Sequence, residues 1–177
     1  MSVGKTVTET RTKLAQIMTP NDANVLGKVF GGSILAMIDL TASATSQKFA
    51  GTICVTAAFD RVDFHEPIEV GNLVSMVGTV TFAGRTSMEI TIDVSATDLV
   101  AGTTRQSNTA RVTMVAIKDG KPHPVPKLIY ESREEKINAI VARERRSRRN
   151  LHLEEIAKIR AHWETVSDQD LIKAIEG

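Results

Sequence analysis

The chain has 177 residues and a formal net charge of +1 at neutral pH, which allows one core of ordinary size and gives no global attraction to nucleic acid or to a membrane surface. Its apolar content of 42% is ordinary for a soluble globular protein. The single cysteine, Cys54, excludes an internal disulfide and fits a reducing compartment. Because there is no N-terminal apolar h-region and no apolar run long enough to span a bilayer, we expect a soluble, cytoplasmic protein.

The first 17 residues mix threonine with alternating charges and scattered apolar residues, and they predict an edge strand. Residues 18–24 contain proline, asparagine and aspartate, which are typical of a turn. Three glycines, Gly27, Gly31 and Gly32, lead from this turn into the next segment. They allow close backbone approach and present free N–H groups at a helix N-terminus.

The segment from Gly31 to Gln47 contains one ionisable side chain, Asp39, among residues that are small or apolar. Its apolar residues recur at helical spacing, which predicts a helix that is buried nearly all round. A carboxylate in such a place is costly unless it is paired or used. Asp39 could bond to backbone or to a neighbouring arginine, but the residues around this helix favour a functional role.

Four strand-like runs follow the helix, at residues 53–64, 73–82, 86–97 and 108–117. The third run alternates most regularly between apolar and polar side chains. The tight connection Ala83-Gly84-Arg85 predicts an antiparallel hairpin between the second and third runs. With the edge strand, these elements predict an α+β domain in which a one-sided sheet curls around the helix. The predicted inward-facing residues are Val74, Met76, Val80, Phe82, Met88, Ile90, Ile92, Val94, Ala96, Ala110, Val112, Met114 and Ala116.

Three prolines between residues 122 and 126 break regular structure, so we expect a first domain over residues 1–128 and a helical C-terminal extension over residues 129–177. Within the extension, apolar residues at helical spacing predict helices at 131–150 and 153–163. A last helix is expected to begin at the capping pair Ser167 and Asp170.

Five arginines, at positions 143, 145, 146, 148 and 149, could indicate nucleic-acid binding. Because no groove-reading module accompanies them, we interpret them as a solvated helix face or a subunit contact. The sequence also contains no metal-ligand cluster, phosphate-binding glycine loop or Ser-His-Asp arrangement. We therefore expect no metal, no cofactor and no nucleic-acid partner.

Three separate motifs resemble one known family. They are Met18-Thr19-Pro20 with Asn24 to Asp39, then Asp63 to Gly71, and then Gly84 to Glu89. In this order, over roughly residues 7–128, they are similar to the hotdog-fold acyl-CoA thioesterases. The resemblance is strongest to the bacterial short acyl-CoA hydrolases related to brain acyl-CoA hydrolase.

This resemblance implies a hotdog fold, in which a five-stranded antiparallel sheet wraps around the long central helix. It implies a homodimer with the two sheets joined edge to edge, and further assembly into a hexamer as a trimer of dimers. It also implies an active site across the dimer interface, with Asn24 and Asp39 as catalytic residues. Coenzyme A is expected near Arg85, Thr86 and Ser87.

Hydrolysis of a thioester needs a base or nucleophile at the carbonyl carbon and donors for the developing oxyanion. Asp39 could activate water or attack directly, and Asn24 could orient the water or the carbonyl. The backbone N–H groups of Gly31 and Gly32, at the positive end of the helix dipole, are candidate oxyanion donors. His65 is not expected to be catalytic, since lone loop histidines are usually solvated or structural.

We therefore expect a thioesterase that hydrolyses fatty acyl-CoA to free fatty acid and coenzyme A. A non-catalytic acyl-CoA sensor on the same fold is the alternative, but such a binder does not need Asp39 and Asn24 beside a thioester. A third interpretation is a dehydratase or hydratase acting on acyl thioesters. Those enzymes pair a catalytic histidine with an acid, and no histidine lies in or just before the central helix.

Overall fold

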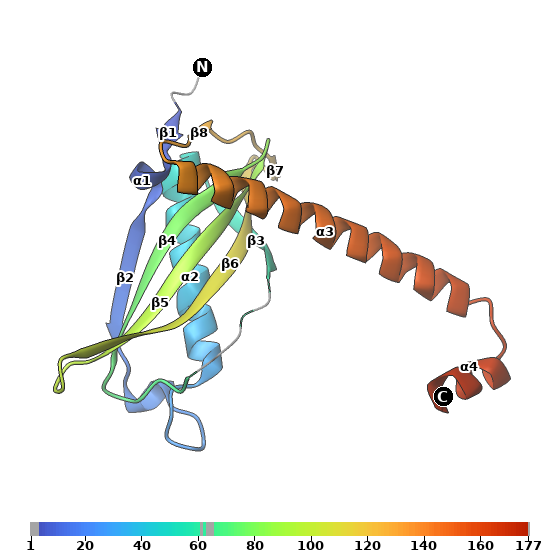
Figure 1. Cartoon of the computed structure of the whole chain (residues 1–177), viewed down its shortest axis with the longest axis horizontal. Coiled ribbons are helices and arrows are strands. Elements are labelled where there is room, and N and C mark those ends of the chain that lie inside the picture. The colour runs from blue at the N-terminus through green and yellow to red at the C-terminus, as the bar shows by residue number, and fades with distance from the viewer. Residues whose placement is uncertain (1–3, 61, 63–65, 177) are drawn as a thin grey trace. The chain divides into compact units, whose positions relative to one another are not determined.

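The computed structural model describes residues 4–60, 62 and 66–176. The chain forms two compact units, Met1–Ala139 and Ile140–Gly177. The sheet and the central helix belong to the first unit (Figure 1). Within the described ranges, no helix is both long and apolar enough to cross a membrane.

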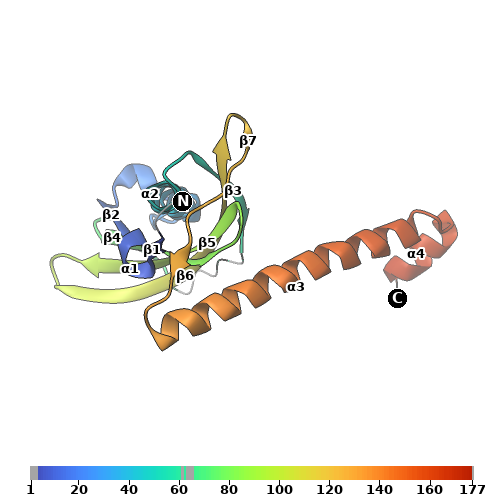
Figure 2. The ribbon, with the colours of Figure 1, turned by 90° about the horizontal axis from the view of Figure 1, so that it is seen from above.

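The main sheet of the first unit is antiparallel, with the strand order β2-β4-β5-β6-β3, and a short strand, β7, pairs with β6. Strands β1 and β8 form a separate parallel pair. Figure 2, seen from above, shows the main sheet curling around helix α2. This arrangement confirms the predicted α+β hotdog class.

The elements, in chain order, are β1 (Lys5–Thr6), α1 (Val7–Thr10), β2 (Thr12–Ile17), the 3-10 turn η1 (Pro20–Asp22), α2 (Gly31–Ala50), β3 (Cys54–Phe59), β4 (Leu73–Ala83), β5 (Ser87–Asp98), β6 (Thr103–Lys118), β7 (Lys121–Pro122), β8 (Leu128–Ile129), α3 (Arg133–Trp163) and α4 (Asp168–Glu176).

Helix α2 is the long central helix that the sequence predicts, but it is not buried nearly all round, because Leu35 and Leu40 remain exposed. It ends at Gly51, whose φ of 70° is the left-handed conformation that favours glycine at a helix C-terminus. Two threonines on its sheet-facing side are fully buried, Thr41 and Thr45. The Oγ1 atom of each donates to the carbonyl one turn earlier, at 2.8 Å and 2.7 Å. These hydroxyls are therefore satisfied inside the core and need no further partner.

The inner face of the sheet follows the predicted alternation on β5 and β6, where every predicted inward residue is at most 1% exposed. On β4, Phe82 departs from the prediction and is only partly buried. The ladder shifts register between Val80 and Phe82, which breaks the strand's alternation at that point. The alternation of β5 predicts that Glu89 faces outward into solvent, but its side chain is buried. Thr81 Oγ1 donates to Glu89 Oε1 at 3.1 Å.

The N-terminal edge strand is shorter than predicted, because only Thr12–Ile17 pairs with the sheet. Residues Val7–Thr10 form a helical turn instead. This turn is started by a capping box, in which Glu9 N donates to Thr6 Oγ1 at 3.3 Å and Thr6 N donates to Glu9 Oε2 at 2.6 Å. The strand predicted over residues 53–64 ends at Phe59, and residues 61 and 63–65 lie outside the described residues.

Downstream of the sheet, the two helices predicted at 131–150 and 153–163 are one continuous helix, α3. No proline or glycine interrupts the segment between them, so nothing in the sequence ends the first helix. Helix α4 begins after Ser167, whose Oγ accepts from Asp170 N at 3.4 Å as the capping pair predicts. The predicted division of the chain after residue 128 stays a prediction.

Gly78 in β4 allows close contact between the sheet and α2. A Cβ at this position would clash with Thr45 Oγ1 and lie 3.0 Å from Thr41 Cγ2. We predict that Gly78→Ala lowers the free energy of unfolding by about 1–3 kcal/mol, the usual cost of overpacking a core. Urea denaturation measures this loss, and in a Thr45→Ala background the loss should be smaller, because the clashing oxygen is gone. Equal losses in both backgrounds would contradict the proposed contact.

Candidate active site

Asn24 lies in the turn between η1 and α2, and its side-chain oxygen holds that turn together. Asn24 Oδ1 accepts from the backbone N–H of Leu26 at 2.9 Å and of Lys28 at 3.2 Å. The backbone N–H of Asn24 donates to the Lys28 carbonyl at 2.7 Å. Because the oxygen serves the turn, the side-chain NH₂ group is the part of Asn24 that can donate to a ligand.

A hollow of about 410 Å³ adjoins Asn24 at the N-terminus of α2. The N-cap residue, Phe30, has no side-chain acceptor, so it leaves the first N–H groups of the helix uncapped. These N–H groups and the helix dipole favour an oxygen that carries negative charge. The hollow is lined by Asn24, Leu26, Lys28, Val29, Gly31, Ile34, Glu66, Pro67 and Ile68.

Asp39 is partly buried on the side of α2 that faces β3. Thr56 Oγ1 donates to Asp39 Oδ1 at 2.5 Å, and the same hydroxyl lies 3.4 Å from Met114 Sδ. Among the described residues, Thr56 is the one hydrogen-bond partner of this carboxylate. The Asp39 Oδ2 atom can therefore accept a proton or approach an electrophile while Oδ1 stays anchored.

Thr56 is the residue of this pair that the sequence analysis missed. Threonine is common in strands, so its presence in a β-rich run carries no signal of a special role. A usable signal was its position on the strand that directly follows the central helix, since consecutive elements are usually adjacent in space.

The predicted coenzyme A residues lie at the hairpin end between β4 and β5. Gly84 N donates to the Ser87 carbonyl at 2.8 Å, and Ala116 N donates to the Thr86 carbonyl at 3.0 Å. Arg85 is exposed, whereas Ser87 is buried. The ladders align Ser87 with Val115 on β6, one row from the Thr56–Met114 pair. Strand β6 therefore lies between the hairpin end and the Asp39–Thr56 pair.

The predicted site residues thus form two groups within one chain. Asn24 and Gly31 line the hollow at the start of α2, and Gly32 packs beside the ring of Phe30. Asp39 does not line this hollow. It lies eight residues after Gly31 in the same helix, which is roughly 12 Å at 1.5 Å per residue.

Apolar side chains remain exposed on α2 and β3, around the Asp39–Thr56 pair. Leu40 on α2 is 63% exposed, and Val55 on β3 is 47% exposed. Strand β3 is the last strand in the order of the main sheet. An apolar surface at a sheet edge is typical of a site where another chain binds. The exposed apolar residues of this surface also include Leu35, Ile53 and Phe59.

The single cysteine, Cys54, is not activated as a nucleophile. Burial raises the pKa of its thiol, against a smaller opposing effect of a hydrogen bond with Ser46. The thiol donates to the Thr52 carbonyl at 3.6 Å. His65 lies outside the described residues, and the residues that are described contain no group of His, Cys, Asp and Glu that could hold a metal ion.

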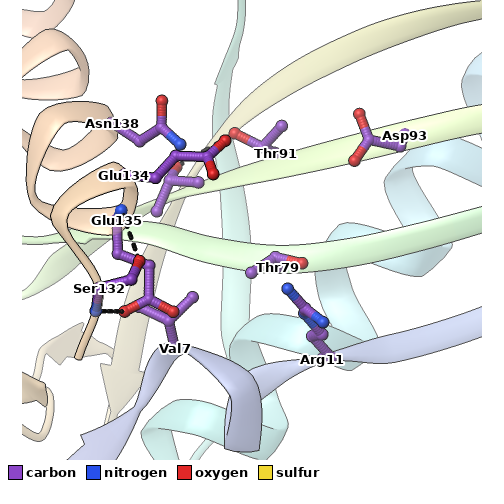
Figure 3. Close-up of a pocket in the computed structure, with 10 residues that line it drawn as sticks. Val7, Arg11, Thr79, Thr91, Asp93, Ser132, Glu134, Glu135 and Asn138 are labelled. Atoms are coloured by element: carbon purple, nitrogen blue, oxygen red, sulfur yellow. Dashed lines mark hydrogen bonds between the residues drawn. The ribbon is translucent and has the colours of Figure 1, made fainter. Parts of the chain in front are cut away.

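A second hollow, of about 280 Å³, lies on the outer face of the sheet and is bordered mainly by polar side chains (Figure 3). Ser132 caps the start of α3 beside it, where Glu135 N donates to Ser132 Oγ at 3.1 Å. None of the predicted site residues borders this hollow. Its lining residues are Val7, Arg11, Thr79, Thr81, Thr91, Asp93, Ser132, Glu134, Glu135 and Asn138.

Residues 26–103 match the family model described as the thioesterase superfamily. The Bacillus subtilis protein YkhA, described as an uncharacterized acyl-CoA thioester hydrolase, is 36% identical to this chain over 117 residues. The matched region covers 66% of this chain and 68% of YkhA.

Two solved structures are similar over most of their length. A hexameric acyl-CoA thioesterase in its apo form has a TM-score of 0.81 and 37% identity, covering 85% of this chain and 97% of that one. The acyl-CoA hydrolase from Staphylococcus aureus, in complex with butyryl coenzyme A, coenzyme A and coenzyme A disulfide, has a TM-score of 0.80 and 31% identity, covering 92% of this chain and 100% of that one. The Staphylococcus enzyme has also been solved with an asparagine, an aspartate or a threonine replaced by alanine. By sequence and by fold, the chain belongs to the hotdog-fold thioesterase superfamily and, within it, to the acyl-CoA thioester hydrolases.

Proposed function

We propose that this chain hydrolyses fatty acyl-CoA to a free fatty acid and coenzyme A, with Asp39 and Asn24 as its catalytic residues. The observation that carries the proposal is the Asp39–Thr56 pair. Asp39 is the one carboxylate of α2, and the Thr56 hydroxyl holds its Oδ1 atom at 2.5 Å. A partly buried carboxylate with one oxygen anchored suits a general base or a nucleophile.

The Staphylococcus hydrolase supports this assignment. The asparagine, aspartate and threonine that were replaced in it follow one another at intervals of 15 and 17 positions. The same residue types stand at the same intervals here, 15 from Asn24 to Asp39 and 17 from Asp39 to Thr56. We infer that Asn24, Asp39 and Thr56 act together, with Thr56 as the residue that positions Asp39.

The proposed reaction uses the residues as follows. Asp39 Oδ2 either takes a proton from the attacking water or attacks the thioester carbonyl carbon itself, forming an anhydride that water then hydrolyses. In both mechanisms the C–S bond breaks and coenzyme A leaves as the thiol. The fatty acid that is formed contains an oxygen atom from water. The Asn24 NH₂ group and the N–H groups of Gly31 and Gly32 donate to the carbonyl oxygen as its negative charge develops.

We also propose that two subunits build each site. Asn24 precedes α2, whereas Asp39 lies within it, so one chain does not bring both to one carbonyl. Pairing of two β3 edges would cover exposed Val55 and Leu40 and would extend the sheet. Antiparallel α2 helices would then bring Asn24 of one subunit toward Asp39 of the other. Relatives described as hexameric support further assembly, which we propose is a trimer of dimers.

Coenzyme A itself is proposed to bind at the hairpin end. Arg85 is exposed there and can contact phosphate, while Thr86 and Ser87 add polar groups at the same hairpin end. We propose that residues 129–177 contribute to assembly and are dispensable for the chemistry. The cytoplasmic location stays a prediction from the sequence.

Asp39→Asn should keep the fold and lower turnover by at least ~100-fold, the usual scale for a positioned acid–base group. Thr56→Val should lower kcat less, by roughly 10-fold, since it removes only the group that orients the carboxylate. Release of coenzyme A from acyl-CoA of several chain lengths, followed with a thiol reagent, measures both effects. Thr104→Val, in an exposed position of β6 opposite Thr97 of β5, is the matched control and should behave as wild type. A folded Asp39→Asn variant with near-normal turnover would remove Asp39 from the mechanism.

Arg85→Ala should raise KM for acyl-CoA with little change in kcat, because it removes binding that is equal in the ground and transition states. The increase should shrink as salt is added, since exposed charge contacts are screened. Lys13→Ala removes an exposed positive charge from β2 and serves as the control. An unchanged KM for Arg85→Ala at low salt would refute the assignment.

The two-subunit site predicts complementation between inactive variants. Asn24→Ala and Asp39→Ala subunits are mixed under conditions that allow exchange, and mixed dimers are confirmed by native mass spectrometry. Each mixed dimer contains one doubly altered site and one intact site, so activity should return. Confirmed exchange without any return of activity would show that Asn24 and Asp39 act within one chain.

A further inference from the structure

The segment Glu66–Ile68 forms one wall of the hollow beside Asn24, and charged side chains hold this wall and the adjoining Glu69 from two sides. At one end, Lys28 Nζ lies 2.6 Å and 2.8 Å from the two carboxylate oxygens of Glu69. At the other end, Arg105 of β6 lies 2.6 Å from Glu66 Oε2 through its NH1 group. The NH2 group of Arg105 donates to the Pro67 carbonyl.

The two ends of this wall are held in different ways. The Glu69 end is also fixed by backbone, because Val29 N–H donates to the Ile68 carbonyl at 2.9 Å and Asn72 Oδ1 accepts from Glu69 N at 3.2 Å. Proline has no N–H group, so Pro67 can join a hydrogen-bond network only through its carbonyl. Among the described residues, Arg105 makes the only hydrogen bonds to Glu66 and Pro67.

We propose that Arg105 is a positioning residue for the acyl group of the substrate. It does not line the hollow, but it binds the carbonyl of Pro67, which lines the hollow together with Val29 and Ile34. Its planar guanidinium reaches two acceptors at once, which fixes both the position and the orientation of the wall. The inference rests on the proposed hydrolysis of fatty acyl-CoA and adds that the acyl chain lies in this hollow, whose lining includes apolar Leu26, Val29, Ile34 and Ile68.

This role differs from a contribution to stability or to coenzyme A binding. The Arg105–Glu66 pair is partly exposed, with 35% and 59% of the side chains accessible, and such pairs contribute little to global stability. Both acceptors of Arg105 belong to the wall. Free coenzyme A has no acyl group, so its binding should not depend on how Pro67 is held.

Arg105→Ala should raise KM for long-chain acyl-CoA by about 3- to 10-fold, with kcat within about 2-fold of wild type, as expected for lost ground-state fit. The inhibition constant of free coenzyme A should stay unchanged. Arg105→Lys should recover part of the loss, because an ammonium can reach one of the two acceptors. Glu66→Gln keeps an acceptor oxygen for Arg105 but loses the charge, so it should raise KM less than Arg105→Ala does.

Arg111→Ala is the matched control, since it removes the same charge from the same strand and Arg111 makes no described contact with the wall. Equal KM values for Arg105→Ala and Arg111→Ala, or a parallel change in the inhibition constant of free coenzyme A, would overturn the proposal. If Arg105→Ala does not fold, the KM of Arg105→Lys is compared with that of Arg111→Ala. Equal values for these two variants would overturn the proposal. Wild-type enzyme that releases no thiol would instead refute the proposed function.

Discussion

The structure of the first unit depends on the close packing of α2 against the inner face of its sheet. Gly78 removes the side chain that would separate them, and the adjacent Thr41 and Thr45 satisfy their hydroxyls within the helix. This contact determines which side of α2 is buried. The remaining side, which carries Asp39, is left facing β3 at the edge of the sheet.

A sheet of five main strands cannot enclose a helix completely, and the incomplete side has chemical consequences. Several exposed residues of α2 and β3 are large and apolar, and contact with another apolar surface would remove them from water. The same edge contains the Asp39–Thr56 pair, whereas Asn24 is at the start of the helix. A second copy of the chain would solve both problems, because it would cover the apolar surface and supply the missing amide.

Much of this fold could be predicted from the sequence, and the failures have identifiable causes. Helix α2 and strand β5 were predictable because their periodicities are undisturbed over many residues. The prediction that Phe82 faces inward was wrong because the strand shifts register between Val80 and Phe82. Such a shift changes which face of the sheet a side chain lies on, but it leaves no trace in the composition of the strand. The α1 turn was missed because its signal, the Thr6–Glu9 capping box, spans only one turn within a strand-like segment.

The candidate site was predictable in part, for a different physical reason. Asp39 was conspicuous because a carboxylate in an apolar helix is costly, and that cost is visible in the sequence. The role of Thr56 in holding Asp39 depends on a contact between a helix and a strand 17 residues later. Arg105 reaches Pro67 across 38 residues of chain. Such contacts have no local signature, because a hydroxyl or a guanidinium on a strand is unremarkable until its partner is known.

The groups available for chemistry occur where the fold leaves hydrogen-bonding capacity unused. Inside the core, buried hydroxyls such as those of Thr10 and Thr41 already bond to backbone carbonyls, and they cannot serve a substrate. The Asn24 NH₂ group, the first N–H groups of α2 and the Oδ2 atom of Asp39 lie instead at a turn, a helix end and a sheet edge. Because every copy of the chain has these incomplete ends, the proposed catalysis and the proposed assembly would depend on the same surface. A substitution that weakens the β3 edge should therefore reduce activity and oligomer stability together, whereas a substitution at Arg105 should change substrate fit alone.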